Sequence, residues 1–102
     1  MTPRRLIPSA AYTLARSQCS DEIHQKLIKP AESLIAYYPT GGTQVSGTKT
    51  WFVRMKAPKL PPLRVLYRIE DGVGCHLLAM EICDYPAPGP ISDYQTLDDA
   101  ER

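Results

Sequence analysis

Residues 50–69 read TWFVRMKAPKLPPLRVLYRI, and this stretch decides the predicted fold. Apolar and polar side chains alternate on both sides of the Pro-rich segment APKLPP, which is the pattern of two half-buried β-strands joined by a loop. Antiparallel pairing places Arg54 and Lys56 on the same face as Arg64 and Arg68, because the side chains of a strand alternate with a period of two. The other face then carries the apolar side chains of a core.

The same region concentrates positive charge. Between Thr48 and Ile69 the chain has six basic residues and no carboxylate: Lys49, Arg54, Lys56, Lys59, Arg64 and Arg68. Cations held together on one surface usually face an anionic partner, so we expect this surface to bind a polyanion such as nucleic acid. Two simpler interpretations remain open. The cations can form a solvated face, or the two arginines of the second strand can pair with Glu22, Glu32 or Glu70.

The flanking residues extend the two strands into a small sheet. Residues 70–72 (EDG) predict a tight turn into a third strand, from about Val73 to Cys83. Near the N-terminus, RRLIP predicts a short strand that ends at Pro8, because proline cannot donate to a strand ladder. A meander of at least three antiparallel strands is therefore expected after the N-terminal strand.

Two helices are predicted between the first strand and the meander. Ser9 is a suitable N-cap for the first, with an apolar stripe of Ala10, Ala11, Leu14 and Ala15. Ser20 is a suitable N-cap for the second, whose apolar residues recur at helical spacing: Ile23, Leu27, Ala31, Leu34, Ile35 and Tyr38. Pro30 should kink or divide that helix. The fold class is α+β, with an N-terminal strand and a two-helix hairpin packed on a twisted antiparallel β-sheet.

Composition predicts one domain followed by a tail. A chain of 102 residues with 43% apolar content is large enough for a single core. Residues 1–85 hold eleven Lys/Arg and seven Asp/Glu, for a charge of +4, whereas residues 86–102 carry −3. The sequence PAPGP at 86–90 cannot continue a strand or helix. We therefore expect a domain over 1–85 and a flexible acidic tail over 86–102, disordered or docked on the basic face.

Cysteine usage and hydropathy favour a cytoplasmic protein. The three cysteines form no CxxC pair and no cluster with histidine at zinc-ligand spacing, so neither a disulfide framework nor a metal or other cofactor is expected. No apolar run approaches the roughly 20 residues that span a bilayer, and the start MTPRRLIPSAA lacks the long apolar core of a secretory signal. No membrane partner is expected.

The order of strand, helical hairpin and basic meander resembles the RelE/ParE superfamily of bacterial toxin-antitoxin toxins. LIPSAAYTL is similar to the family's opening strand and helix, VSGTKTWFVRMK to its glycine-then-strand element, and LRVLYRIEDG to its most typical string. HLLAMEICDY is similar to its closing strand. Together these strings cover residues 5–85.

The resemblance implies a ribosome-dependent messenger-RNA endonuclease or, in the ParE branch, an inhibitor of DNA gyrase. A cognate antitoxin protein would hold either activity silent. In the resemblance Arg64 occupies the position of the transition-state arginine, and Arg54 and Lys56 lie on a strand where the RelE branch has basic side chains. Tyr85 occupies the position of a terminal functional tyrosine.

The chemistry of RNA cleavage requires the same residue types. Attack by the 2′-hydroxyl needs a base, cations that stabilise the phosphorane, and an acid for the leaving 5′-oxygen. Arg64 and Arg54 suit the cationic role, because guanidinium groups bind phosphate oxygens in bidentate fashion. Glu81 or Asp84 is the candidate base, with Tyr85 as a hydrogen-bonding or acidic partner. The remaining phosphate-binding candidates are Lys49, Lys56, Lys59 and Arg68.

Simple alternation along the closing strand places His76 on the face opposite Glu81, and Cys75 on the same face as Glu81. The closing strand also departs from the family pattern, because RelE-type toxins commonly have a further basic residue or a histidine where residues 81–84 read EICD. This departure leaves open a different base, a gyrase-type target, or a fold without catalysis. A further alternative is an interaction domain whose sheet edge accepts an antitoxin-like segment by strand addition.

Overall fold

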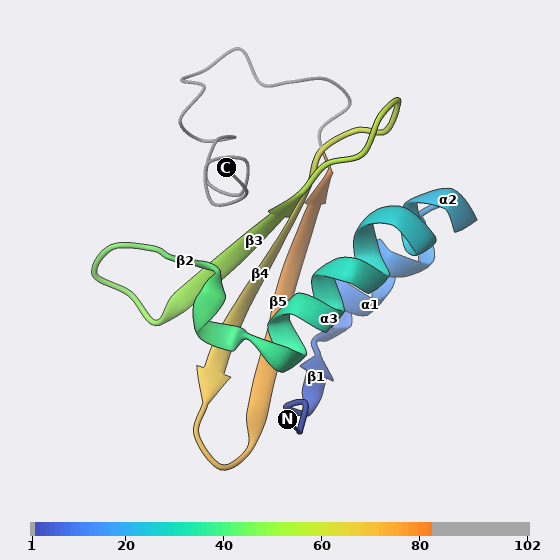
Figure 1. Cartoon of the computed structure of the whole chain (residues 1–102). Helices are drawn as coiled ribbons and strands as arrows, with labels where there is room; N and C mark the ends of the chain where they lie inside the picture. The colour runs from blue at the N-terminus through green and yellow to red at the C-terminus, as the bar shows by residue number, and fades with distance from the viewer. Residues whose placement is uncertain (1, 83–102) are drawn as a thin grey trace.

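The computed structural model describes residues 2–82, and every structural statement below concerns that part of the chain. Five strands form one sheet in the order β1-β5-β4-β3-β2, with helices between β1 and β2 (Figure 1). The elements are β1 Leu6–Pro8, α1 Ala10–Ser17, α2 Asp21–Ile23, a π-helical turn η1 His24–Ile28, α3 Lys29–Tyr37, a 3-10 turn η2 Pro39–Gly41, β2 Thr43–Gln44, β3 Thr50–Met55, β4 Leu63–Glu70 and β5 Gly74–Ile82. The predicted α+β class is confirmed.

The sheet is mixed, whereas the sequence predicted an antiparallel one. Strands β2 to β5 pair antiparallel, but β1 runs parallel to β5, with Leu6 beside Cys75 and Pro8 beside Leu77. The backbone carbonyl of Arg5 accepts a hydrogen bond from the Cys75 amide at 2.8 Å and extends this contact by one residue. Parallel neighbours require a connection that crosses over a sheet face, and here the helices provide part of it.

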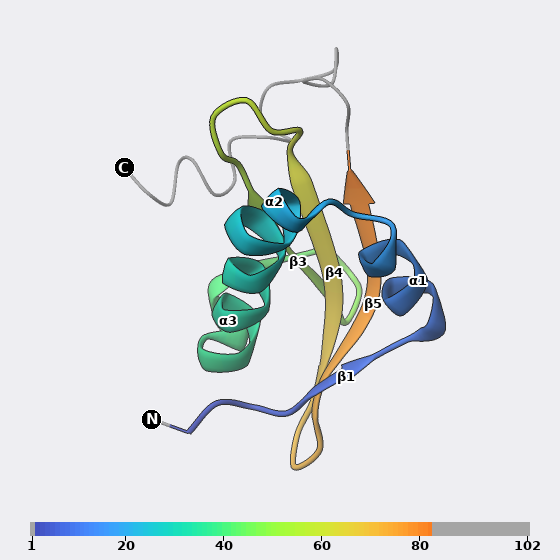
Figure 2. The same ribbon diagram turned by 90° about the vertical axis from the view of Figure 1, so that its right-hand side faces the viewer.

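The helices form a hairpin on one face of the sheet, with α1 and α3 running in opposite directions (Figure 2). Ser9 and Ser20 cap α1 and α2 as predicted. The side chain of each serine accepts a hydrogen bond from the backbone amide three residues further along the chain. Pro30 lies in the first turn of α3, directly after the π-helical turn. Residues 21–37 are helical without interruption, and Pro30 lies where the π-helical turn passes into α3, so the irregularity expected at Pro30 takes the form of a change in helix type.

The predicted apolar stripe of α1 is wrong. Leu14 is 61% exposed, and the buried residue of α1 is Tyr12. The hydroxyl of Tyr12 donates to Glu32 Oε2 at 2.7 Å, and Arg16 Nε donates to the same oxygen at 2.9 Å. This contact joins α1 to α3 on the side of α1 that faces the core. Burial, together with the bond to Glu32, raises the pKa of Tyr12 well above its ordinary value.

The core lies between the helical hairpin and the sheet. Two predicted members of the second helix's stripe, Leu34 and Tyr38, are exposed instead. Tyr67 is fully buried and Trp51 packs against the core, both as their parity predicts. The buried side chains that meet in the core are Tyr12, Leu27, Ile28, Ala31, Ile35, Val53, Leu63, Val65, Tyr67, Cys75 and Leu77.

Candidate functional site

The face of the sheet that points away from the helical hairpin carries the residues of interest, and we call it the open face. Strand register defines it, because residues directly opposite each other on neighbouring strands share a face. Phe52 pairs with Leu66, Arg54 with Arg64, and Thr50 with Arg68 on β3 and β4. On β4 and β5 the pairs that belong to the open face are Arg64 with Glu81, Leu66 with Ala79, and Arg68 with His76.

Arg54 and Arg64 stand directly opposite each other at one end of the open face. Both guanidinium groups lie near the ring of Phe52, with Cζ to ring-centroid distances of 5.2 Å for Arg54 and 5.5 Å for Arg64. An aromatic ring attracts cations to its face, so Phe52 helps to keep two like charges side by side. Arg54 is 8% exposed, whereas the Arg64 side chain is 34% exposed.

Glu81 contacts Arg64 from the neighbouring strand. Its Oε1 accepts a hydrogen bond from Nε of Arg64 and forms an ion pair with Nη2 of the same side chain. The Glu81 side chain remains 48% exposed. The structure therefore brings three predicted site residues together, namely Arg54, Arg64 and Glu81. It also contradicts the suggested pairing of Arg64 with Glu22, Glu32 or Glu70.

Those three carboxylates have other partners. Glu22 pairs with Lys26 at 3.4 Å, Glu32 with Arg16, and Glu70 with His76 at 2.6 Å. Within residues 2–82 no ion pair joins them to Arg64 or Arg68. Arg64 instead pairs with Glu81, the acidic residue of β5.

A β-bulge in β5 overturns the predicted faces of His76 and Cys75. The register passes from Leu66 opposite Ala79 to Tyr67 opposite Leu77, so Leu78 is an extra residue. An extra residue in one strand reverses the alternation beyond it. His76 therefore shares the open face with Glu81, and Cys75 is fully buried in the core, where burial raises its pKa.

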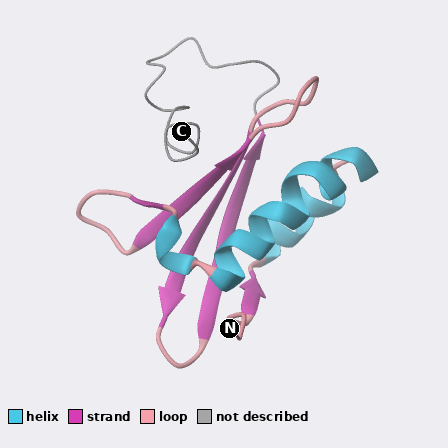
Figure 3. Ribbon diagram, in the orientation of Figure 1, coloured by secondary structure: helices cyan, strands magenta, loops and turns pink. Residues whose placement is uncertain are grey.

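The basic residues divide between two ends of the open face. Arg64 and Arg68 are four residues apart on β4, a separation of about 13 Å along a strand. Lys56 directly follows the last residue of β3, and Lys59 lies in the β3–β4 loop, which extends beyond the strand ends (Figure 3). Lys49 precedes β3 at the end near Arg68. The predicted cluster is therefore densest around Arg54 and Arg64.

Phe52 was not among the predicted site residues. The signal was present in the sequence, because Phe52 has the same parity as Arg54 in TWFVRMK and therefore had to share its face. The predicted residues Asp84 and Tyr85, and the tail over 86–102, lie outside the described residues. Their roles in a site stay predictions.

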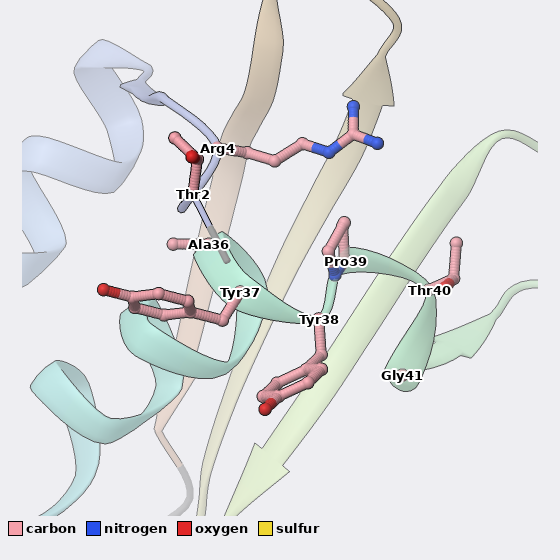
Figure 4. Close-up of a pocket in the computed structure, with 8 residues that line it drawn as sticks. All are labelled: Thr2, Arg4, Ala36, Tyr37, Tyr38, Pro39, Thr40 and Gly41. Carbon is pink, nitrogen blue, oxygen red and sulfur yellow. The ribbon is translucent and has the colours of Figure 1, made fainter.

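A pocket on another part of the molecule contains none of the predicted site residues. It has a volume of about 480 Å³ and lies between the N-terminal segment, which carries Arg4, and the end of α3, which carries Tyr37 and Tyr38 (Figure 4). Its lining has no carboxylate: Thr2, Arg4, Ala36, Tyr37, Tyr38, Pro39, Thr40 and Gly41. Among residues 2–82 no group of three or more His, Cys, Asp or Glu side chains is arranged to hold a metal ion.

No protein-family model matches the chain, and no curated protein matches its sequence. Within the described part of the chain, no helix is both long and apolar enough to cross a bilayer.

Proposed function

We propose that this chain is a RelE/ParE-like toxin that cleaves messenger RNA on the ribosome through attack by the RNA's own 2′-hydroxyl. A cognate antitoxin is the protein partner under this proposal, and the cytoplasm is its compartment. One observation carries the proposal. Two guanidinium groups, of the buried Arg54 and the half-buried Arg64, stand opposite each other on the sheet face that points away from the helical hairpin, and the Glu81 carboxylate is held against Arg64.

The order of elements supports the family part of the proposal. The strings that resemble the family fall on β1 with α1, on β3, on β4 and on β5. The helical hairpin precedes the antiparallel strands and covers only one face of the sheet (Figure 2). This arrangement is compatible with the fold that the resemblance implies.

Under this proposal Glu81 is the general base. Its carboxylate takes the proton of the 2′-hydroxyl, the 2′-oxygen attacks phosphorus, and the bond from phosphorus to the 5′-oxygen breaks. The products are a 2′,3′-cyclic phosphate and a 5′-hydroxyl, whose proton comes from an acid. Asp84 and Tyr85 are the candidate acids suggested by the sequence.

Arg64 can hold the Glu81 carboxylate and bind the RNA phosphate at the same time. A guanidinium group has five N–H donors in a planar fork, and Arg64 directs only Nε and Nη2 toward Glu81. Its remaining donors can bind a non-bridging phosphate oxygen, with Arg54 on the neighbouring strand as the second cation. Donors placed where negative charge develops contribute roughly 10²–10³-fold each to a rate.

Induced expression in bacterial cells tests this function. We expect the wild-type chain to arrest growth and to create new transcript 5′ ends, because cut messenger RNA stops translation. Arg64→Ala should lower the number of cut ends by about 10²–10³-fold. Arg4→Ala is the control of equal charge change, since Arg4 lies beside the end of α3. Intact transcripts during wild-type induction would contradict the proposal.

A second candidate function is a non-catalytic toxin or partner-binding module of the same fold. The ion pair between Arg64 and Glu81 favours it, because a carboxylate on the arginine lowers the net positive charge that a phosphate meets. Under this candidate, which includes inhibition of DNA gyrase, induction produces double-strand DNA damage or no effect. In neither case are transcripts cut.

A further inference from the structure

We propose that the acidic segment 86–102 of this chain binds the open face and competes there with a nucleic-acid ligand. Any effect on toxicity rests on the function proposed above, whereas the contact itself does not.

The open face combines apolar and cationic groups in a fixed order. Phe52, Leu66 and Ala79 are aligned across β3, β4 and β5, and all three are half-buried. Arg54 and Arg64 lie on one side of this apolar row, with Glu81 paired to Arg64. Arg68 lies on the other side, next to His76, which is hydrogen-bonded to Glu70. Such a face suits a chain that carries both apolar side chains and carboxylates.

The segment 86–102 has this composition. It reads PAPGPISDYQTLDDAER and carries −3, because Arg102 offsets only one of its four acidic residues. Its apolar side chains, Ile91, Tyr94 and Leu97, recur every three residues before the acidic end. The charge is opposite in sign to that of residues 1–85, which carry +4. The two parts of the chain are therefore complementary in charge and in apolar content.

The last described strand ends beside the open face. Strand β5 ends at Ile82, which pairs with Leu63, and the neighbouring pair is Arg64 with Glu81. Twenty residues follow Ile82. A flexible chain of that length has a root-mean-square extent of about 25 Å, close to the roughly 27 Å length of an eight-residue strand. The acidic end can therefore reach both Arg64 and Arg68.

Tethering makes such a contact effective even when each ion pair is weak. Exposed ion pairs contribute little individually and are screened by salt. A short flexible tether, however, provides an effective concentration in the millimolar range. Competition of this kind should weaken the binding of a free polyanion by about twofold to tenfold, and a tight ligand should displace the segment.

The first test measures the affinity of the full-length chain for a fluorescent single-stranded RNA 12-mer at low salt. Asp98→Asn/Asp99→Asn should tighten binding by about twofold to tenfold. Asp21→Asn/Glu22→Gln is the matched control, because it changes the net charge by the same amount on the exposed start of α2. If both double variants tightened RNA binding equally, the effect would come from net charge alone, and the proposal would be overturned.

The second test locates the contact in the full-length wild-type chain by zero-length carbodiimide cross-linking, which joins carboxylates to lysines. We expect intramolecular cross-links from residues 93–101 to Lys56 and Lys59, which flank the open face, and few to Lys26 and Lys29 of the helices. Cross-links to the helical lysines, none at all, or links between two chains in place of intramolecular ones would each overturn the proposal. Links between chains would indicate a second copy as the occupant.

These tests separate the contact from the activity. Cross-links to the open face without transcript cleavage would retain this inference and reject the endonuclease. Transcript cleavage without these cross-links would do the reverse.

Discussion

His76 and Glu81 share one face of β5 although they are five residues apart. Leu78 is the extra residue that makes this possible, and its backbone carbonyl accepts a hydrogen bond from Ser9 Oγ at 2.9 Å. The same Ser9 oxygen accepts from the Tyr12 amide at 3.0 Å as the N-cap of α1. Ser9 therefore connects the bulge of the sheet to the start of the helical hairpin.

Ser9→Ala should lower the free energy of unfolding by about 2 kcal/mol, because it removes a helix cap and a second hydrogen bond worth roughly 1 kcal/mol each. Ser20→Ala is the control. It removes only the cap of α2, whose bond to the Ile23 amide is 3.3 Å long and exposed. Urea unfolding measures both, and equal losses would contradict a structural role for the bulge contact.

Gly42→Ala should destabilise the chain by about 1–3 kcal/mol through overpacking. A Cβ at this position would lie 2.6 Å from Tyr67 Oη and 2.7 Å from the backbone oxygen of Phe52. Gly41→Ala is the neighbouring control, since its Cβ would meet nothing closer than Tyr38 Cβ at 3.4 Å. Thermal unfolding that fails to separate the two variants would contradict the packing described here.

Because of Tyr67, we expect the free energy of unfolding to fall at alkaline pH. Burial raises its pKa to about 12, and its hydroxyl donates to the Pro39 carbonyl at 2.5 Å. Above pH 10 the unfolded tyrosine releases its proton while the folded one retains it, so the free energy of unfolding falls between pH 10 and 12. Tyr67→Phe should cost about 1–3 kcal/mol at pH 7.

The wild type and Tyr67→Phe should then become more similar in stability as the pH rises through that window. Tyr12, whose pKa is also raised, is present in both proteins and cancels in the comparison. Urea unfolding at pH 7, 10 and 11.5 provides the measurement. A constant difference across the series would show that the Tyr67 hydroxyl is not protected from ionisation.

Glu81→Gln separates binding from catalysis. Removing the carboxylate frees the donors of Arg64, so affinity for single-stranded RNA should stay the same or rise, while cleavage should fall by about 10²–10⁴-fold if Glu81 is the base. Glu70→Gln gives the same charge change beside His76, at the other end of the open face. Transcript cutting by Glu81→Gln at the wild-type level would remove Glu81 from the mechanism.

Regular patterns in the sequence predicted much of the fold. Alternation in residues 50–69 was sufficient to pair β3 with β4 and to place Arg54, Arg64 and Arg68 on one face. Ser9 and Ser20 were recognisable as caps because their side chains bond to the backbone a few residues away. Such contacts depend on local sequence alone.

Features that depend on distant contacts were missed. Tyr12 is the buried residue of α1, where it packs in the core and its hydroxyl donates to Glu32 on another helix. The bulge at Leu78 has no glycine to mark it, and it reversed the predicted faces of His76 and Cys75. The parallel direction of β1 and the pairing of Arg64 with Glu81 likewise arise from tertiary structure.

The most direct test of the account is the salt dependence of RNA binding by the purified full-length chain. Each phosphate contact adds about 0.7 to the slope of log affinity against log salt for a single strand. Arg64→Gln and Arg54→Gln should each lower this slope by about that amount, whereas Arg4→Gln should leave it unchanged. A slope that is equal in all four proteins would contradict the central claim that the open face binds phosphodiesters.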